Sequence, residues 1–211
     1  LQELDHAKNY FFTNISHEFR TPLTIISGMS KQIINDPKQW TQKGAVLIQR
    51  NSDNLLQLVN QIMDLRKLES SREKVSYVQG DVVEFVQFLV ESYQNYASGK
   101  SITLHYLKEV PRLETDYDPD KLMKILSNLL SNAVKFSPPD GNIYLLIEQV
   151  AETSGSKLII KVKDTGIGIA PDKLPKVFDR YFQVEEKYRQ KKNTRQGNTG
   201  TGIGLSLTKE L

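Results

Sequence analysis

Apolar residues in the first third of the chain recur every three to four positions, which is typical of amphipathic helices. One such pattern covers residues 1 to about 34, and a second runs from about Thr41 to Ser70. Asn35-Asp36-Pro37 between them is typical of a turn. The pattern predicts two long helices joined as an antiparallel hairpin. The apolar stripes are Phe12, Ile15, Phe19, Leu23, Ile26 and Met29 in the first helix, and Ile48, Leu55, Leu58, Ile62 and Leu65, widened by Leu56, Val59, Met63 and Leu68, in the second.

These apolar faces are wider than one hairpin can cover. Pairing with a second copy into a four-helix bundle is the natural completion, so we expect a homodimer. The alternative, that both helices pack on the rest of their own chain, stays open. Pro22 lies inside the first helix and predicts a kink there, because proline removes one backbone hydrogen bond.

The polar stretch Glu69–Lys74 predicts a domain boundary, with one domain at residues 1–70 and a second at 71–211. Beyond it, helix and strand patterns mix without strict alternation, which favours a two-layer α/β sandwich. The expected elements are a strand at 75–78, a helix from the capping residue Asp81 to about 97, strands near 102–106 and 113–117, a helix at 120–136, a strand hairpin at 143–150 and 157–163, and a short helix at 206–211.

Composition narrows the possible functions. The chain has 211 residues, 28 Lys and Arg against 25 Asp and Glu, and no Cys, which excludes disulfides, thiolate metal sites and cysteine nucleophiles. Basic residues cluster only at 187–195, so we expect no nucleic-acid binding. No run is long and apolar enough for a membrane span, and no signal-peptide pattern opens the chain. We therefore expect a soluble chain, with any membrane crossing left to segments outside it.

Four groups of polar or glycine residues carry candidate chemistry. His17 falls on the polar face of the first helix, where a neutral imidazole can act as a nucleophile, although it can equally be an ordinary surface residue. Asn128, Asn132 and Lys135 share one helix face by their spacing. Amide oxygens suit Mg²⁺ and a lysine suits phosphate, and the alternative is a polar surface stripe.

Two glycine-containing stretches complete the candidate chemistry. Asp164, with Gly166 and Gly168 after it, follows an apolar strand, where burial of a carboxylate is costly unless it is hydrogen-bonded; an adenine amine would serve. Gly200-Thr201-Gly202-Ile203-Gly204-Leu205 precedes a helix and can offer backbone N–H groups to phosphate. That stretch is neither a P-loop nor a dinucleotide-binding fingerprint. An ordinary glycine turn with a capping Asp is the alternative for the first stretch.

In order and spacing, these stretches resemble the motifs of the sensor histidine kinases of two-component systems, over nearly the whole chain. The matching stretches are residues 10–24 (phosphoacceptor box), 124–137 (asparagine box), 164–169 (first glycine box), 177–182 (phenylalanine box) and 200–205 (second glycine box). The resemblance implies a dimeric helical-hairpin domain, followed by an ATP-binding domain of the type found in gyrase, Hsp90 and histidine kinases.

The resemblance also implies residue roles. His17 would accept the γ-phosphate of ATP, Glu18 would orient or deprotonate it, and Thr21 would position water for a phosphatase activity. Asn132 would bind Mg²⁺. The nucleotide-binding residues would be Asn128, Asn132, Lys135, Asp164, Gly166, Gly168, Phe178, Gly200, Thr201, Gly202, Gly204 and Leu205, with Phe178 favoured for packing. The basic segment 183–199 would form a lid over the nucleotide. The related ATPases have a glutamate base where this chain has Asn128, which favours transfer to His17 over hydrolysis.

The implied partners are a second copy of the chain and a response-regulator receiver domain, and the implied cofactors are ATP and Mg²⁺. The expected location is the cytoplasmic portion of an inner-membrane sensor protein. Family members continue beyond the helix at which this chain stops, so the second domain is expected to be incomplete at Leu211. Two alternatives remain, a pseudokinase scaffold that acts by dimerisation and partner binding, and a water-directed ATPase.

Overall fold

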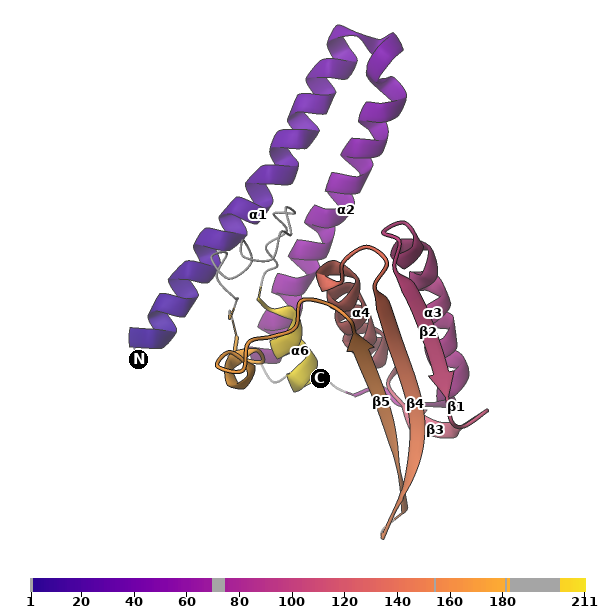
Figure 1. Cartoon of the computed structure of the whole chain (residues 1–211). Coiled ribbons are helices and arrows are strands. Elements are labelled where there is room, and N and C mark those ends of the chain that lie inside the picture. The colour runs from indigo at the N-terminus through magenta and orange to yellow at the C-terminus, as the bar shows by residue number, and fades with distance from the viewer. Residues whose placement is uncertain (1, 70–74, 154, 181, 183–201) are drawn as a thin grey trace. The chain divides into compact units, whose positions relative to one another are not determined.

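The computed structural model divides the chain into two compact units (Figure 1). It describes all residues except 1, 70–74, 154, 181 and 183–201. The first unit comprises residues 1–73, 176–185 and 196–210, and the second comprises residues 74–175, 186–195 and 211. The predicted boundary after residue 70 adjoins undescribed residues and stays a prediction.

Two long helices form the hairpin of the first unit, as predicted. Helix α1 spans Gln2–Asn35 and continues through Pro22, and α2 spans Pro37–Glu69. The turn is shorter than expected, because the second helix begins at Pro37 instead of about Thr41. Proline is favoured at the first position of a helix, where its missing N–H costs no bond. Asp36 is the single residue between the helices, and its Oδ1 accepts a hydrogen bond from the Gln39 N–H at 3.1 Å.

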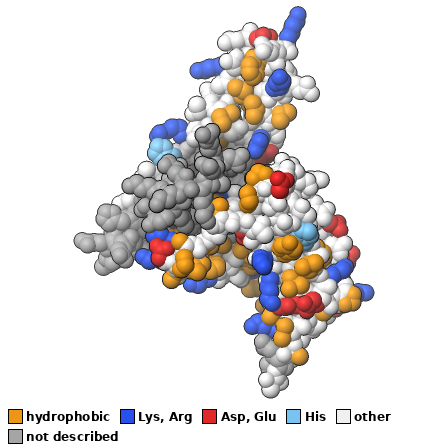
Figure 2. All heavy atoms as spheres, in the orientation of Figure 1, with side chains coloured by type: hydrophobic (Ala, Val, Ile, Leu, Met, Phe, Trp, Pro, Cys, Tyr) orange, Lys and Arg blue, Asp and Glu red, His pale blue; other side chains and the backbone are white. Residues whose placement is uncertain are grey.

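The two helices approach each other closely at Gly44. A β-carbon there would lie 2.8 Å from Cδ1 of Ile33, so this position tolerates no larger residue without movement of Ile33. Ile15 is buried, but many large apolar side chains of the hairpin are exposed. Hydrophobic side chains gather on the visible surface of the hairpin (Figure 2). The exposed ones are Phe12, Leu23, Ile34, Val46, Leu47, Leu56, Val59 and Met63.

The second unit is built on two small sheets. Strands β1 (Val78–Asp81) and β3 (Glu114–Tyr117) pair antiparallel. In the other sheet β4 (Asn142–Glu152) lies between β2 (Thr103–Lys108) and β5 (Gly155–Asp164). The β2–β4 pair is parallel and the β4–β5 hairpin is antiparallel.

Helices α3 (Val82–Ser98) and α4 (Pro119–Phe136) supply the second layer, which confirms the predicted α/β sandwich. Alternate residues of β4 are fully buried, as expected for a strand with one face on the core. Each fully buried Leu, Ile or Val contributes about 1.5–3 kcal/mol. The shared core is made of Val82, Val83, Val86, Leu89, Val90 and Ala97 from α3, Leu126, Leu130, Ala133 and Val134 from α4, Ile143, Leu145 and Ile147 from β4, and Ile102.

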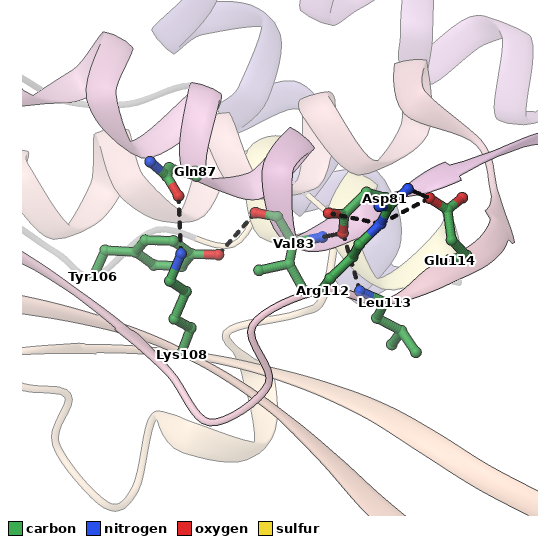
Figure 3. Close-up of polar contacts among 8 residues, drawn as sticks. All are labelled: Asp81, Val83, Gln87, Tyr106, Lys108, Arg112, Leu113 and Glu114. Atoms are coloured by element: carbon green, nitrogen blue, oxygen red, sulfur yellow. Dashed lines mark hydrogen bonds and ion pairs between the residues drawn. The ribbon is translucent and has the colours of Figure 1, made fainter.

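Asp81 caps α3, as the sequence predicts, and also joins that helix to the small sheet (Figure 3). Its Oδ1 accepts hydrogen bonds from the N–H groups of Val83 at 3.0 Å and Leu113 at 3.1 Å. Burial acts to raise the pKa of Asp81, but these backbone bonds and the nearby Arg112 outweigh it and hold the pKa below its ordinary value. The Tyr106 hydroxyl donates to the Val83 carbonyl at 2.9 Å. These bonds fix the first turn of α3 to Tyr106 of β2 and to the backbone at Leu113.

The strand predicted at 75–78 is wrong in position. Residues 75–77 lie outside the sheet, and β1 begins only at Val78. The backbone N–H of Ser76 donates instead to Oδ2 of Asp118, at 2.7 Å. Asp118 also caps α4 through the Lys121 N–H at 3.0 Å. A side-chain acceptor has replaced the strand partner at this position. None of the helices in the described part of the chain combines the length and hydropathy needed to cross a bilayer.

Candidate functional site

A polar face of α4 holds the three residues that the sequence places there. Asn128, Asn132 and Lys135 are all half-buried. The side-chain N–H of Asn132 donates to Oδ1 of Asn128 at 3.5 Å, which leaves the amide oxygen of Asn132 outside that bond. Lys135 Nζ lies 5.3 Å from the ring centre of Phe136. The predicted shared face is therefore present, with an amide oxygen that can bind a metal and an ammonium group within two turns of helix.

The loop after β5 docks against the end of this same helix. Asp164 is the last residue of β5, and its Oδ1 accepts a hydrogen bond from the Gly166 N–H at 2.8 Å. One residue further on, the Ile167 N–H donates to the carbonyl of Phe136 at 3.2 Å. The fold thus brings the first glycine stretch, Asp164–Ile169, to the C-terminal end of the helix that carries Asn132.

Asp164 is exposed, so the expectation of a buried carboxylate in need of a ligand is wrong. Because β5 is paired only with β4 in the described sheet, its end is open, and the Gly166 N–H already satisfies one carboxylate oxygen. Exposure leaves the carboxylate accessible as an acceptor for a ligand.

Gly166 is required by close packing. A β-carbon at this position would lie 2.5 Å from Oδ1 of Asp164 and 2.6 Å from the carbonyl oxygen of Phe136. Real β-carbons essentially never approach other atoms so closely. Gly168 is required for a different reason, since its φ of +68° lies in the left-handed region that favours glycine. The two glycines therefore have separate physical roles.

Sequence reasoning missed a residue that holds this loop in place. The Thr165 hydroxyl accepts a hydrogen bond from the Asn142 N–H at 2.9 Å, and the Thr165 N–H donates to the Asn142 carbonyl at 3.0 Å. Thr165 thereby ties the residue after Asp164 to the start of β4. In the sequence, its position between Asp164 and Gly166 was the only feature that pointed to Thr165. Its two bonds to Asn142 form only when the sheet has brought the two residues together.

His17, Glu18 and Thr21 lie on α1 in the other unit. His17 is exposed, so its ring is accessible. Glu18 is half-buried, and its Oε1 is a buried oxygen that accepts no hydrogen bond from the described residues. The Thr21 hydroxyl donates to the carbonyl of His17 at 3.3 Å. An unsatisfied carboxylate oxygen one residue from an accessible imidazole is a group able to accept a proton.

The second glycine stretch is described only in part. Gly200, Thr201 and the segment predicted as a lid, 183–199, lie outside the described residues. Gly202 has a φ of +71°, and α6 runs from Gly204 to Glu210, close to the predicted helix at 206–211. Leu205 is half-buried. Phe178 is 44% exposed, which does not support the packing role favoured from the sequence.

The side chains of Asn132, Lys135 and Asp164 fit a nucleotide with Mg²⁺ better than a metal ion held by protein alone. The described residues contain no group of three or more His, Cys, Asp or Glu that could hold a metal ion. Mg²⁺ keeps several waters and is usually bound by one or two protein oxygens together with substrate phosphates. The amide oxygen of Asn132 fits that pattern. The acceptor at Asp164 and the ammonium of Lys135 suit an amine and a phosphate respectively.

Comparisons with known proteins match both parts of the chain. A model described as "His Kinase A (phospho-acceptor) domain" matches residues 7–71, and one described as "Histidine kinase-, DNA gyrase B-, and HSP90-like ATPase" matches residues 117–211. Histidine kinase P4 of Formosa agariphila is 39% identical over 213 residues and aligns with 100% of this chain. Sensor histidine kinase TmoS of Ectopseudomonas mendocina is 35% identical over 218 residues, again over 100% of this chain.

Among solved structures, full-length ShkA in complex with AMPPNP matches with a TM-score of 0.66 and 27% identity. The match covers 94% of this chain and 39% of ShkA. The present chain spans 15% of the length of Histidine kinase P4 and 21% of that of TmoS.

Proposed function

We propose that this chain transfers the γ-phosphoryl group of ATP to His17 and from there to an aspartate of a response-regulator receiver domain. The chain belongs to the sensor histidine kinases and carries their phosphoacceptor and ATP-binding catalytic domains. The observation that carries the proposal is the docking of the Asp164–Ile169 loop on the end of α4. It places an exposed carboxylate, two required glycines and the Asn128–Asn132–Lys135 face in one unit.

On the nucleotide side, each residue has a role suited to its chemistry. Asp164 accepts a hydrogen bond from the adenine amine, and Gly166 lets the loop approach the base closely. Lys135 attracts the phosphates, and the glycines at 200, 202 and 204 offer backbone N–H groups to them. Asn132 supplies an oxygen ligand for Mg²⁺, which when bound neutralises charge on the phosphates.

On the acceptor side, the imidazole of His17 attacks the γ-phosphorus. A nitrogen–phosphorus bond forms, the bond from phosphorus to the β–γ bridging oxygen breaks, and ADP leaves with that electron pair. Glu18 accepts or holds the proton of the other ring nitrogen, a role supported by its unsatisfied Oε1. Because Asn128 has no basic group, the site lacks the base that the related ATPases use to activate water.

The hairpin supports a homodimer. Its exposed apolar side chains lie on both helices, and a second copy would bury them in a four-helix bundle. A receiver domain of a response regulator is the proposed phosphoryl acceptor, in line with the family to which the chain belongs. In the whole protein, we propose that segments outside this chain anchor it at the inner membrane, with this chain in the cytoplasm.

Thr21 is the proposed water-positioning residue of a phosphatase activity toward the phosphorylated regulator. Its hydroxyl lies one helical turn after His17 and donates to the His17 carbonyl, a bond that leaves the hydroxyl oxygen able to accept from water. Thr21→Ala should retain His17 labelling and lose regulator dephosphorylation, and Thr21→Ser should retain both. An unchanged dephosphorylation rate in Thr21→Ala would remove this role.

The kinase proposal is tested by labelling with γ-labelled ATP. We expect acid-labile, alkali-stable label on the wild-type chain, none on His17→Gln, and none on Asn132→Ala. His105→Gln is the matched control, because it removes an imidazole from the other unit and should retain label. Label that persists in His17→Gln would contradict the proposal. Failure of the wild-type chain to bind nucleotide would instead support the scaffold alternative, and rapid phosphate release without label would support the ATPase alternative.

A further inference from the structure

An ion pair joins two segments that lie 30 residues apart in the first unit. The Arg180 guanidinium donates to Glu210 through Nε to Oε1 at 2.9 Å, and through Nη2 to Oε1 at 2.7 Å and to Oε2 at 2.8 Å. Both carboxylate oxygens are therefore engaged. Glu210 is the last residue of α6, and Arg180 follows a turn closed by the bond from the Asp179 N–H to the Lys176 carbonyl at 2.9 Å.

The helix that Glu210 ends is short and depends on its surroundings. An isolated helix of seven residues is unstable in water, so α6 must be held by tertiary contacts. At its start, Ile203 is fully buried, and its carbonyl accepts bonds from the Leu207 N–H at 2.9 Å and the Ser206 hydroxyl at 2.8 Å. At its end, Glu210 pairs with Arg180. The start is thus anchored by burial and the end by charge.

The geometry separates this pair from an ordinary surface salt bridge. Exposed single-bond pairs contribute little, because solvent screens them and two long side chains lose freedom. Here each side chain is only 34% exposed, and three short bonds are formed by the planar fork of one arginine. Charge-assisted, two-oxygen contacts of this kind are the stronger class and also fix direction.

We infer that Arg180 and Glu210 are positioning residues for phosphoryl transfer, which hold α6 and thereby the Gly202–Gly204 turn that precedes it. The inference rests on the proposed function, because that function assigns the turn to the phosphates of ATP. Without the pair, the end of α6 is released, the helix tilts about its buried start, and the turn leaves its place. Binding of ATP should weaken while the chemical step, carried by His17 and Glu18, changes less.

The test measures the initial rate of His17 labelling in the full chain at varied ATP concentration, where KM is the ATP concentration of half-maximal rate and kcat is the limiting rate constant. Arg180→Gln and Glu210→Gln should each raise KM for ATP by about tenfold, the size of one charge-assisted contact, with kcat within about threefold of wild type. The double variant Arg180→Glu with Glu210→Arg restores the pair in reverse and should recover most of the KM. Arg112→Gln is the matched control, because it breaks an Arg–Glu pair with Glu114 in the other unit (Figure 3) and should leave KM unchanged.

Wild-type KM values in both single variants would overturn the inference, and so would failure of the reversed pair to recover affinity while circular dichroism shows a folded chain. An equal rise of KM in Arg112→Gln would also overturn it, because the effect would then be a general loss of stability. If the wild-type chain itself takes no label, the proposed function fails, and that outcome is distinct from failure of this inference.

Discussion

Gly166→Ala is expected to weaken nucleotide binding through a steric clash that the structure locates. The added β-carbon would lie 2.5 Å from Oδ1 of Asp164 and 2.6 Å from the Phe136 carbonyl oxygen. The Phe136 carbonyl is the constrained neighbour, because it belongs to the backbone of α4 and accepts the Ile167 N–H at 3.2 Å. The substitution must therefore move the loop, the carboxylate or both.

The size of the effect follows from what must move. Overpacking of a tight site costs about 1–3 kcal/mol. Loss of the Gly166 N–H bond to Asp164 at 2.8 Å adds about 0.5–1.5 kcal/mol, since water competes for the exposed carboxylate. If about 1.4 kcal/mol of this total appears as lost affinity, binding of ATP or ADP weakens by tenfold. We therefore expect at least a tenfold rise in Kd.

The assay is titration calorimetry with ADP on the whole chain, accompanied by thermal unfolding. Gly155→Ala is the matched control, because its φ of +143° also requires glycine while no atom lies within 4 Å of the added β-carbon. This control should lose stability through backbone strain and keep its affinity for ADP. An unchanged Kd in folded Gly166→Ala would refute the reasoning about this loop.

Substitutions at three further positions test the physical account of the fold. Burial raises the pKa of Tyr106 to about 12 from 10, so the unfolded phenol ionises first and stability falls as pH rises from 10 to 12; chemical denaturation should show a flatter alkaline limb in Tyr106→Phe. Gly28→Ala should raise hairpin stability by about 0.5–1 kcal/mol, because it lies inside α1 with no atom within 4 Å of the new β-carbon; a lower melting temperature would contradict this. Asp140 has a φ of +63°, so Asp140→Val should cost about 1–2 kcal/mol in urea unfolding and Asp140→Gly should not.

The sequence predicted those features of the fold that interactions between neighbouring residues determine. The apolar period of the first 70 residues predicted the hairpin, because that period fixes which side chains share a helix face. Asp81 and Asp118-Pro119 predicted the starts of α3 and α4, because a cap satisfies N–H groups within three residues of itself. The start of α2 was predicted too late in the chain, because Pro37 is compatible with both a turn and the first position of a helix.

The candidate site was predicted as a set of residues but not as an arrangement. Spacing alone placed Asn128, Asn132 and Lys135 on one helix face, because a helix fixes that geometry. The contact of Gly166 with Phe136 was not predictable, since it joins residues separated by a whole strand hairpin. The exposure of Asp164 was wrongly predicted for the same reason, because burial at the end of a strand depends on which strands lie beside it.

By itself the sequence determined the helical hairpin, the α/β class of the second unit and the family, and it predicted the residues that are proposed to carry chemistry. These follow from periodicity, capping and motif spacing, which act over a few residues at a time. Only the tertiary structure decided the parallel pairing of Thr103–Lys108 with Asn142–Ile147, the hold of Thr165 on Asn142, and the Arg180–Glu210 pair. Those contacts join distant segments, so they form only when the packed core has fixed where each backbone runs.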